Sequence, residues 1–304
     1  METGLAIRTR NTYIGGSDAA GVLGMSRWNT PLAVWAEKTG QFVRPEMESE
    51  AMELGKELEA YVAKRFERKS GKKVYLGHGT VFHPKYDFLG ATVDRLLQDE
   101  DAGLECKTCA AWKAKEWQDE DIPQEYIIQC YHYMMVTGKP KWYIAVLIGN
   151  QEFKWKEINY DEKVLESILK KEVYFWNEFV LKNQMPLMIQ RKDTDVLEGL
   201  FPSAEEGKIV QLDDEANVLI ETLIANKSDL AACEAAIETN ENNLKALLKD
   251  AEAGETSLYG VYWKNISTKR FDQKAFEIAH PELLAKFKTP KLSRRFNYRP
   301  KGEE

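Results

Sequence analysis

The sequence predicts an α/β core followed by a coiled-coil segment and a basic extension. In the first 190 residues, apolar residues recur at helical spacing in several stretches, and short β-rich runs lie between them. After residue 212, apolar residues follow spacings of four and three. We expect the core to be a mixed central sheet flanked by helices. The predicted segments are a core over 1–190, a linker over 191–211, a coiled-coil helix or helical hairpin over 212–251, and a basic hairpin–helix tail over 252–304.

The first half of the core begins with helices. Two short helices are predicted over 17–25 and 31–39, the second with Pro31 in its first turn. A longer helix is predicted over 52–71, where apolar residues recur at helical spacing and Gly71 marks the end. Four short β-rich runs follow, at 72–76, 79–83, 88–97 and 103–108.

The second half of the core alternates helices and strands. A helix is predicted over 122–138, with Gly138 at its C-terminal end. Two strands are predicted over 141–160, joined at Gly149 and Asn150, a pair typical of a hairpin turn. A long helix over 161–183 closes the core.

Composition and charge narrow the class of protein. The sequence has neither the apolar core of a signal peptide nor a run of about 18 apolar residues, so we expect a cytoplasmic protein with no membrane span. The net charge is −7, but the chain from Lys264 onward carries +6 and the rest carries −13. This charge has the wrong sign for a nucleic-acid-binding protein, so any contact with DNA would have to come from local patches or bound cations. The basic tail is either solvated or in contact with phosphate.

The segment over 212–251 carries a coiled-coil seam that includes two asparagines. The seam residues are Leu219, Leu223, Asn226, Leu230, Cys233, Ile237, Asn240, Leu244 and Leu247. As one helix the segment would be about 60 Å long, whereas a break near residues 227–229 would fold it into a hairpin. The helix either packs on its own domain or pairs with a second copy or a partner helix, because asparagine in a seam sets the register.

Three charged residues stand in two successive β-rich runs. Asp94 ends the apolar stretch FLGATVD, while Glu105 and Lys107 point to one side of the strand GLECKT and Cys106 to the other. The short acidic turn between the runs should bring them together as a hairpin. Two carboxylates supply oxygen ligands for Mg²⁺, and a nearby lysine can orient a metal-bound water or stabilise a pentavalent phosphate. The alternative from spacing alone is a cross-strand ion pair on a solvated face.

The stretch GGSD before the first helix offers a second candidate site. Its backbone N–H groups and the Ser17 hydroxyl suit an anion, and Arg10 could add a bidentate phosphate contact. Taken without other information, GGSD is an ordinary helix start in which Ser17 or Asp18 caps the helix.

Five stretches resemble the lambda exonuclease and YqaJ viral recombinase group, within the PD-(D/E)xK nuclease superfamily. In the order of that family they are RNTYIGGSDAAGVLG, LGKELEAYVAKRFERKSGKKV, FLGATVDRLL, GLECKT and PQEYIIQCYHYMMVTG. The resemblance spans about residues 8–180 and covers the C-terminal part much less well. The proline that precedes the first aspartate in the family is replaced here by Val93.

This resemblance implies a restriction-endonuclease-like core with a metal site. Asp94 and Glu105 would be the metal ligands, together with the backbone carbonyl of Cys106, and Lys107 would be the catalytic lysine. Glu59 would be the helix glutamate beside the metal.

The resemblance also implies roles for residues outside the two strands. Gln129 matches the glutamine of the QxxxY motif of the family, and Tyr133 lies on the same helical face, where it either looks toward the site or belongs to the core. The residues at positions that contact phosphate in the family are Arg10, Ser17 and Thr92, and Tyr133 is a further candidate for contact with the DNA.

The function implied by the resemblance is that of a Mg²⁺-dependent 5′→3′ exonuclease, with Mn²⁺ as an alternative ion. Such an enzyme acts on linear double-stranded DNA ends and leaves 3′ single-stranded tails for phage-type homologous recombination. A ring-shaped homotrimer, a single-strand annealing (RecT-like) partner and a bacterial host carrying a phage or prophage are also implied. Two other classes stay open: an endonuclease of a restriction or repair system with the same core, and a non-catalytic DNA-binding or assembly protein.

The four cysteines do not change this interpretation. They are too few for a disulfide scaffold, and their spacing matches neither a structural zinc site nor the iron–sulfur cluster of some superfamily members. We therefore expect no iron–sulfur cluster.

Overall fold

The computed structural model describes residues 9–42, 49–118, 121–187, 189–288 and 293–300. The chain forms two compact units, Met1–Pro202 and Ser203–Glu304. The first unit reaches past residue 190, the predicted end of the core, because Asp193 and Val196 are fully buried in it. Residues 289–292 and 301–304 of the predicted tail lie outside the described residues.

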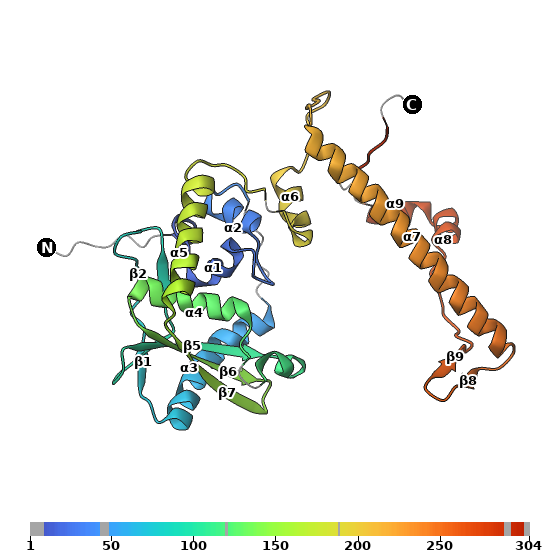
Figure 1. The fold of residues 1–304 in the computed structure, drawn as a ribbon. Coiled ribbons are helices and arrows are strands. Elements are labelled where there is room, and N and C mark those ends of the chain that lie inside the picture. Colours follow the sequence, from blue (N-terminus) through green and yellow to red (C-terminus); the bar gives the residue numbers. More distant parts are fainter. Residues whose placement is uncertain (1–8, 43–48, 119–120, 188, 289–292, 301–304) are drawn as a thin grey trace. The chain divides into compact units, whose positions relative to one another are not determined.

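A five-stranded sheet forms the centre of the first unit (Figure 1). In spatial order its strands are β1 (Val74–Leu76), β4 (Arg95–Leu97), β5 (Ala102–Cys109), β6 (Lys141–Ile148) and β7 (Glu152–Asn159). Strands β5 and β6 are parallel, and the other neighbouring pairs are antiparallel. A parallel pair needs a crossover, and α4 (Gln124–Thr137) lies in that connection. This mixed sheet with flanking helices confirms the predicted fold class.

The β-rich run predicted over 88–97 is divided into two strands with different partners. Strand β3 (Gly90–Thr92) pairs with β2 (Thr80–Phe82) in a separate two-stranded sheet, whereas β4 joins the central sheet. Asp94 lies at the division. The backbone at Gly77 closes on this point, since a Cβ there would lie 2.3 Å from the backbone oxygen of Val93.

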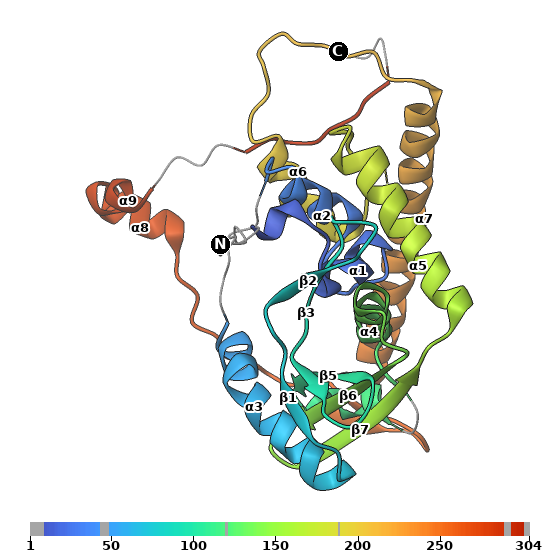
Figure 2. The ribbon, with the colours of Figure 1, turned by 90° about the vertical axis from the view of Figure 1, so that its left-hand side faces the viewer.

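Helices cover both faces of the central sheet (Figure 2). On one face lies α3 (Glu50–Ser70), whose Phe66 packs in a buried cluster with Leu104 and Tyr143. The other face is covered by α4 and, around it, by α1 (Gly16–Val22), α2 (Pro31–Lys38) and α5 (Glu162–Phe175). Shorter helices are η1 (Arg10–Thr12), η2 (Ala111–Trp117), the π-helical η3 (Trp176–Val180), η4 (Arg191–Asp193) and α6 (Thr194–Leu200).

The second unit contains one long helix, α7 (Asp214–Leu248), rather than a helical hairpin. The Asp213 side chain caps it by accepting a hydrogen bond from the N–H of Ala216. Seam residues such as Leu230 and Ile237 are more than half exposed, at 57% and 58%. The remaining elements are β8 (Ala253–Glu255), β9 (Gly260–Tyr262), α8 (Gln273–Ala279) and α9 (Pro281–Phe287). Within the described ranges, no helix is both long and apolar enough to cross a membrane.

Gly103 is expected to tolerate no side chain. It is buried in β5, and a Cβ there would lie 2.2 Å from the ring of Trp142. We expect Gly103→Ala to lower the free energy of unfolding by about 1–3 kcal/mol, because the packed core must move to make room. The control is Gly55→Ala in α3, where the nearest atom to a Cβ is Thr108 Oγ1 at 3.5 Å. That change should raise the free energy of unfolding by about 0.5–1 kcal/mol, and equal effects in urea unfolding would contradict the packing argument.

Candidate active site

Asp94 lies beside β5, where the chain passes from β3 to β4. Its Oδ2 accepts a hydrogen bond from the backbone N–H of Cys106 at 2.8 Å. Strands β4 and β5 pair antiparallel with Arg95 opposite Leu104. The structure therefore brings Asp94 to the strand that carries Glu105 and Lys107.

Glu105 is 2% exposed and uses only one of its two carboxylate oxygens. Its Oε1 accepts a hydrogen bond from Gln129 Nε2 at 2.8 Å and lies 2.5 Å from Lys107 Nζ. Its Oε2 is buried and, among the described residues, has no hydrogen-bond partner. A buried carboxylate oxygen without a partner is costly, so this arrangement favours a cation at Oε2.

Lys107 is held in its charged form. Burial lowers the pKa of Lys107, but the Glu105 carboxylate raises it by more, so the net pKa lies above the usual lysine value. The ring of Tyr126 lies 4.9 Å from Lys107 Nζ, which adds a cation–π contact. At neutral pH this side chain can donate hydrogen bonds but cannot act as a base.

Asp94 is unusual among carboxylates. Burial, and then the negative charge of Glu105, raise the pKa of Asp94 to about 8. Two carboxylates this strongly coupled resist holding two negative charges unless a cation lies between them or one takes a proton.

The residues present fit a divalent cation of the Mg²⁺ type. In the part of the chain that the structure describes, no group of three or more His, Cys, Asp or Glu side chains is arranged to hold a metal ion. Mg²⁺ is commonly bound by one or two carboxylates, with water and substrate phosphate at its other positions. Asp94 and the free Oε2 of Glu105 supply that set. The backbone carbonyl of Cys106 stays a predicted further ligand.

Glu59 is linked to the other predicted site residues through Arg95. It lies on α3, and its Oε1 is 2.5 Å from Nη1 of Arg95, which also donates to the backbone oxygen of Asp94 at 2.6 Å. Glu59 therefore reaches the site through Arg95, and its negative charge contributes to the raised pKa of Asp94.

Gln129 and Tyr133 lie on the same face of α4, as their spacing indicates. Gln129 Nε2 lies 2.7 Å from the hydroxyl oxygen of Tyr133, in addition to its bond to Glu105. Tyr133 is 4% exposed and packs against the start of α1, since a Cβ on Gly16 would lie 2.5 Å from its ring. Burial raises the pKa of Tyr133 well above its usual value, so its hydroxyl stays neutral. Tyr133 thus connects the carboxylate site to α1.

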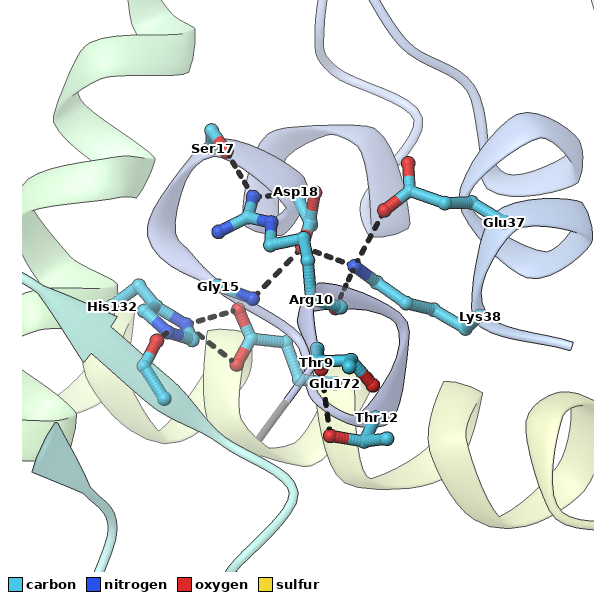
Figure 3. A network of polar contacts seen from close by, with 11 residues as sticks. Thr9, Arg10, Thr12, Gly15, Ser17, Asp18, Glu37, Lys38, His132 and Glu172 are labelled. Atoms are coloured by element: carbon cyan, nitrogen blue, oxygen red, sulfur yellow. Dashed lines mark hydrogen bonds and ion pairs between the residues drawn. The ribbon is translucent and has the colours of Figure 1, made fainter. Parts of the chain in front are cut away.

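A polar network surrounds the start of α1 (Figure 3). Arg10 Nη2 lies 3.0 Å from Asp18 Oδ1 and donates to Ser17 Oγ. Asp18 Oδ2 accepts from the Gly15 N–H at 2.9 Å and lies 2.8 Å from Lys38 Nζ. The helix cap is therefore Gly15 rather than Ser17 or Asp18, because the Asp18 side chain reaches back to the Gly15 N–H.

The network leaves one cation at the surface. Burial raises the pKa of Asp18, but the charges of Arg10 and Lys38 lower it by more, so Asp18 stays ionised. The Lys38 side chain is fully buried, whereas the Arg10 side chain is 45% exposed. The structure therefore fixes Arg10 and Ser17 together with the guanidinium accessible to an anion.

Thr92 lies apart from this network. It is exposed at the end of β3, where its hydroxyl shares a hydrogen bond of 2.7 Å with the hydroxyl of Thr80. It precedes Asp94 by two residues in the chain, and it contacts neither Arg10 nor Ser17 in the described interactions.

Three residues that support the two sites were not predicted from the sequence. Lys38 and Arg95 fix Asp18 and Glu59, and Tyr126 lies against Lys107. Tyr126 precedes Gln129 by three residues, about one helical turn. This spacing is the one sequence feature that could have placed Tyr126 near the site. The ion pairs join elements far apart in the chain, which spacing cannot show.

Comparison with known proteins finds a matching family model and a curated relative. Residues 7–140 match the model of the YqaJ-like viral recombinase domain. The uncharacterized protein YqaJ of Bacillus subtilis (strain 168) is 39% identical over 290 residues, which cover 94% of this chain and 91% of that protein.

Solved structures of exonucleases are also similar. An alkaline exonuclease from Laribacter hongkongensis is 21% identical, with a TM-score of 0.49 over 57% of this chain and 90% of that one. A phage-related exonuclease from Haemophilus somnus 129PT is 13% identical, with a TM-score of 0.43 over 57% of this chain and 96% of that one.

Proposed function

The chain belongs to the YqaJ-like viral recombinase family, and from this we propose that it is a divalent-metal-dependent deoxyribonuclease. The observation that carries the proposal is the pair of the half-buried Asp94 and the buried Glu105, with Lys107 beside Glu105 and, among the described residues, no hydrogen-bond partner for the Oε2 of Glu105. This arrangement suits hydrolysis of a phosphodiester at a metal ion.

In this proposal the residues of the site bind the metal ion, orient its ligands or donate hydrogen bonds to the reacting groups. Asp94 and Glu105 would hold Mg²⁺, or Mn²⁺ in its place, with the carbonyl of Cys106 as a further ligand. When bound, the cation would lower the pKa of a water ligand and offset phosphate charge. Gln129 holds Oε1 of Glu105 and so keeps Oε2 directed to the metal position. Lys107, protonated, is positioned to donate to the attacking water or to the charged phosphate oxygens.

The Arg10 and Ser17 pair supports the finer proposal of 5′→3′ polarity. Arg10 is accessible and anchored by Asp18, and Tyr133 joins α1 to the carboxylate site. Arg10 and Ser17 would bind the 5′-terminal phosphate, and Thr92 would contact another phosphate of the same DNA strand. These contacts would fix the end of a duplex near Lys107. The enzyme would then release nucleotides from linear double-stranded DNA and leave 3′ single-stranded tails for recombination.

The assembly is proposed from family membership. A ring-shaped homotrimer around DNA and a single-strand annealing (RecT-like) partner fit a phage-type recombinase acting in a bacterial cytoplasm. The exposed seam of α7 and the basic tail are then available for such contacts.

Digestion of three DNA substrates in Mg²⁺ tests the proposed function. We expect rapid loss of linear duplex with 5′-phosphate ends, slower loss of the same duplex with 5′-hydroxyl ends, and no loss of a covalently closed circle. A nicked or linearised circle would favour an endonuclease with the same core. Intact DNA in every case would leave a DNA-binding or assembly protein.

Arg10→Gln is expected to remove the preference for a 5′ phosphate. The charge-assisted bonds of the guanidinium contribute to binding of the phosphorylated end, so its rate should fall by about tenfold or more while the 5′-hydroxyl rate changes little. Arg68→Gln, at an exposed position near the end of α3, is the control. Equal losses on both kinds of end would contradict the phosphate role.

Metal binding is expected to strengthen as pH rises toward 8. The pKa of Asp94 in the folded protein is about 8, above its ordinary value of 3.8, so at pH 6 a metal must displace a proton. Between pH 3.8 and about 8, Asp94 keeps its proton in the folded metal-free protein but loses it in the unfolded chain. The metal-free protein therefore loses stability as pH rises through this range. Thermal unfolding should therefore show a larger stabilisation by Mg²⁺ at pH 8.5 than at pH 6. In Asp94→Asn, the stabilisation by Mg²⁺ should no longer differ between the two pH values. Equal stabilisation of the unchanged protein at pH 6 and pH 8.5 would contradict the prediction.

A further inference from the structure

Two exposed tryptophans lie in segments that contact each other near the end of β5: Trp28 in the loop after α1, and Trp112 in η2 next to Lys113. Trp28 is 58% exposed and Trp112 is 82% exposed. Lys113 Nζ lies 4.8 Å from the centre of the Trp28 ring, and Arg27 Cζ lies 5.9 Å from it. We refer to Trp28, Trp112 and Lys113 as the aromatic platform. Tyr and Trp rings supply large contact areas at binding surfaces, and these two rings lie in segments joined to the candidate active site, as shown below.

The backbone beneath Trp28 is fixed. The hydroxyl of Ser26, itself 7% exposed, accepts hydrogen bonds from the N–H groups of Trp28 and Asn29 at 3.0 and 3.1 Å. Arg27 pairs with Glu116 of η2 at 2.6 Å and also with Glu125. The loop after α1 and the helix η2 are therefore joined, and the platform is formed before any ligand arrives.

The platform adjoins the candidate active site. Helix η2, which carries Trp112 and Lys113, follows β5 in the chain. Glu125, the partner of Arg27, precedes Tyr126, whose ring lies 4.9 Å from Lys107 Nζ. A DNA strand that reaches Lys107 therefore passes close to the platform.

We propose that the aromatic platform stacks on unpaired nucleobases of the DNA strand held at the active site. Indole rings stack on any base, because every base has a π face, and lysine adds cation–π and phosphate contacts. The positive charge of Arg27 is offset by Glu116 and Glu125, so the surface is better suited to bases than to the phosphate backbone. This inference deepens the proposed function and rests on it, since it presumes that DNA reaches Lys107.

Binding of two single strands tests the proposal. The full chain, without divalent cations, would be titrated into a fluorescent oligothymidylate and into an abasic strand of equal length, and anisotropy would be measured. The unchanged protein should bind the oligothymidylate more tightly. Trp112→Ala and Trp28→Ala should each weaken that binding by roughly 5- to 150-fold and leave the abasic strand unaffected. Trp112→Phe should keep most of the affinity.

Tyr174→Ala is the matched control. Tyr174 lies on α5 and is 59% exposed, close to the exposure of Trp28, and its removal should change neither affinity. The proposal is overturned if the unchanged protein binds neither strand or binds both equally, or if Trp112→Ala weakens both alike. Digestion of linear duplex shows which proposal has failed. If the protein degrades the duplex but its binding does not depend on bases, the proposal for the aromatic platform is wrong and the proposed function stands. If the protein does not degrade the duplex, the proposed function itself is wrong.

Discussion

Glu105→Gln is expected to reduce Mg²⁺-dependent DNA degradation by at least about 10²–10³-fold while the protein stays folded. The change removes the negative charge of a carboxylate that is 2% exposed. Asp94 is then the one carboxylate left of the pair, and the positive charge of Lys107 is enough to balance it without a metal ion. Lys107 has no oxygen to offer a cation, and the neutral amide oxygen of a glutamine does not replace the charge of the lost carboxylate. Gln is close to Glu in volume, so packing around β5 should be preserved.

The control for this variant is Glu57→Gln. Glu57 lies two residues from Glu59 on α3 and is exposed, so its loss should change the rate by less than about twofold. The measurement is the initial rate of nucleotide release, together with a circular dichroism spectrum of each variant. A Glu105→Gln protein that keeps its rate would show that the pair with Asp94 is only structural.

Glu172→Ala is expected to lower the free energy of unfolding by about 3–5 kcal/mol. Glu172 and His132 are both fully buried, and Nδ1 of His132 lies 3.0 Å from each carboxylate oxygen of Glu172 (Figure 3). Nε2 of the same ring lies 3.0 Å from the backbone oxygen of Gly90. Both ring nitrogens face oxygen atoms, and the pKa of His132 is raised, so the site favours the charged ring that donates from both nitrogens. Removing Glu172 leaves that charge buried without a partner.

The double variant His132→Leu with Glu172→Leu is the informative control. Replacing a whole buried ion pair by apolar side chains is often neutral or stabilising, so the double variant should be far more stable than Glu172→Ala. Urea unfolding of the three proteins gives the comparison. If Glu172→Ala and the double variant were equally unstable, the loss would come from packing and not from an unpaired charge.

The same pair predicts loss of stability at alkaline pH. Burial lowers the pKa of His132, but Glu172 raises it by more, so the net pKa lies above the ordinary value of 6.5. A histidine whose folded-state pKa is raised contributes fully below its unfolded pKa and less as pH rises through the folded value. The unchanged protein should therefore lose stability above about pH 6.5, whereas the double variant should lack this component.

The parts of the fold that the sequence predicts well are those set by local backbone geometry. Helices α3 and α4 end at Ser70 and Thr137, each followed by a glycine in the left-handed region, with φ of 75° at Gly71 and 73° at Gly138. The turn between β6 and β7 likewise has Gly149 at a φ of 54°. Such positions favour glycine whatever the rest of the chain does, so a single sequence reveals them.

Features that depend on distant partners were not predictable. The run over 88–97 has continuous β character, and its division at Asp94 arises because β3 and β4 pair with different strands. Helix α7 is unbroken because residues 227–229 contain neither Gly nor Pro, so the hairpin alternative had no strong local signal.

The candidate site combines both kinds of information. Strand alternation put Glu105 and Lys107 on one side, and the structure places their charged groups 2.5 Å apart. The pairing of Glu59 with Arg95 needed the folded arrangement of α3 and β4. All of the site roles stay predictions: the catalytic roles of Asp94, Glu105, Lys107, Glu59 and Gln129, and the phosphate or DNA contacts of Arg10, Ser17, Thr92 and Tyr133.

The most direct test is the rate at which mononucleotides are released from a linear 5′-phosphorylated duplex in Mg²⁺ by the unchanged protein and by Lys107→Ala. We predict Mg²⁺-dependent release by the unchanged protein and a fall of about 10²–10³-fold in the variant, with unchanged thermal stability of the second unit, which Lys107 does not belong to. Equal release by both proteins, or release that persists in excess chelator, would contradict the assignment of Asp94, Glu105 and Lys107 as the catalytic centre.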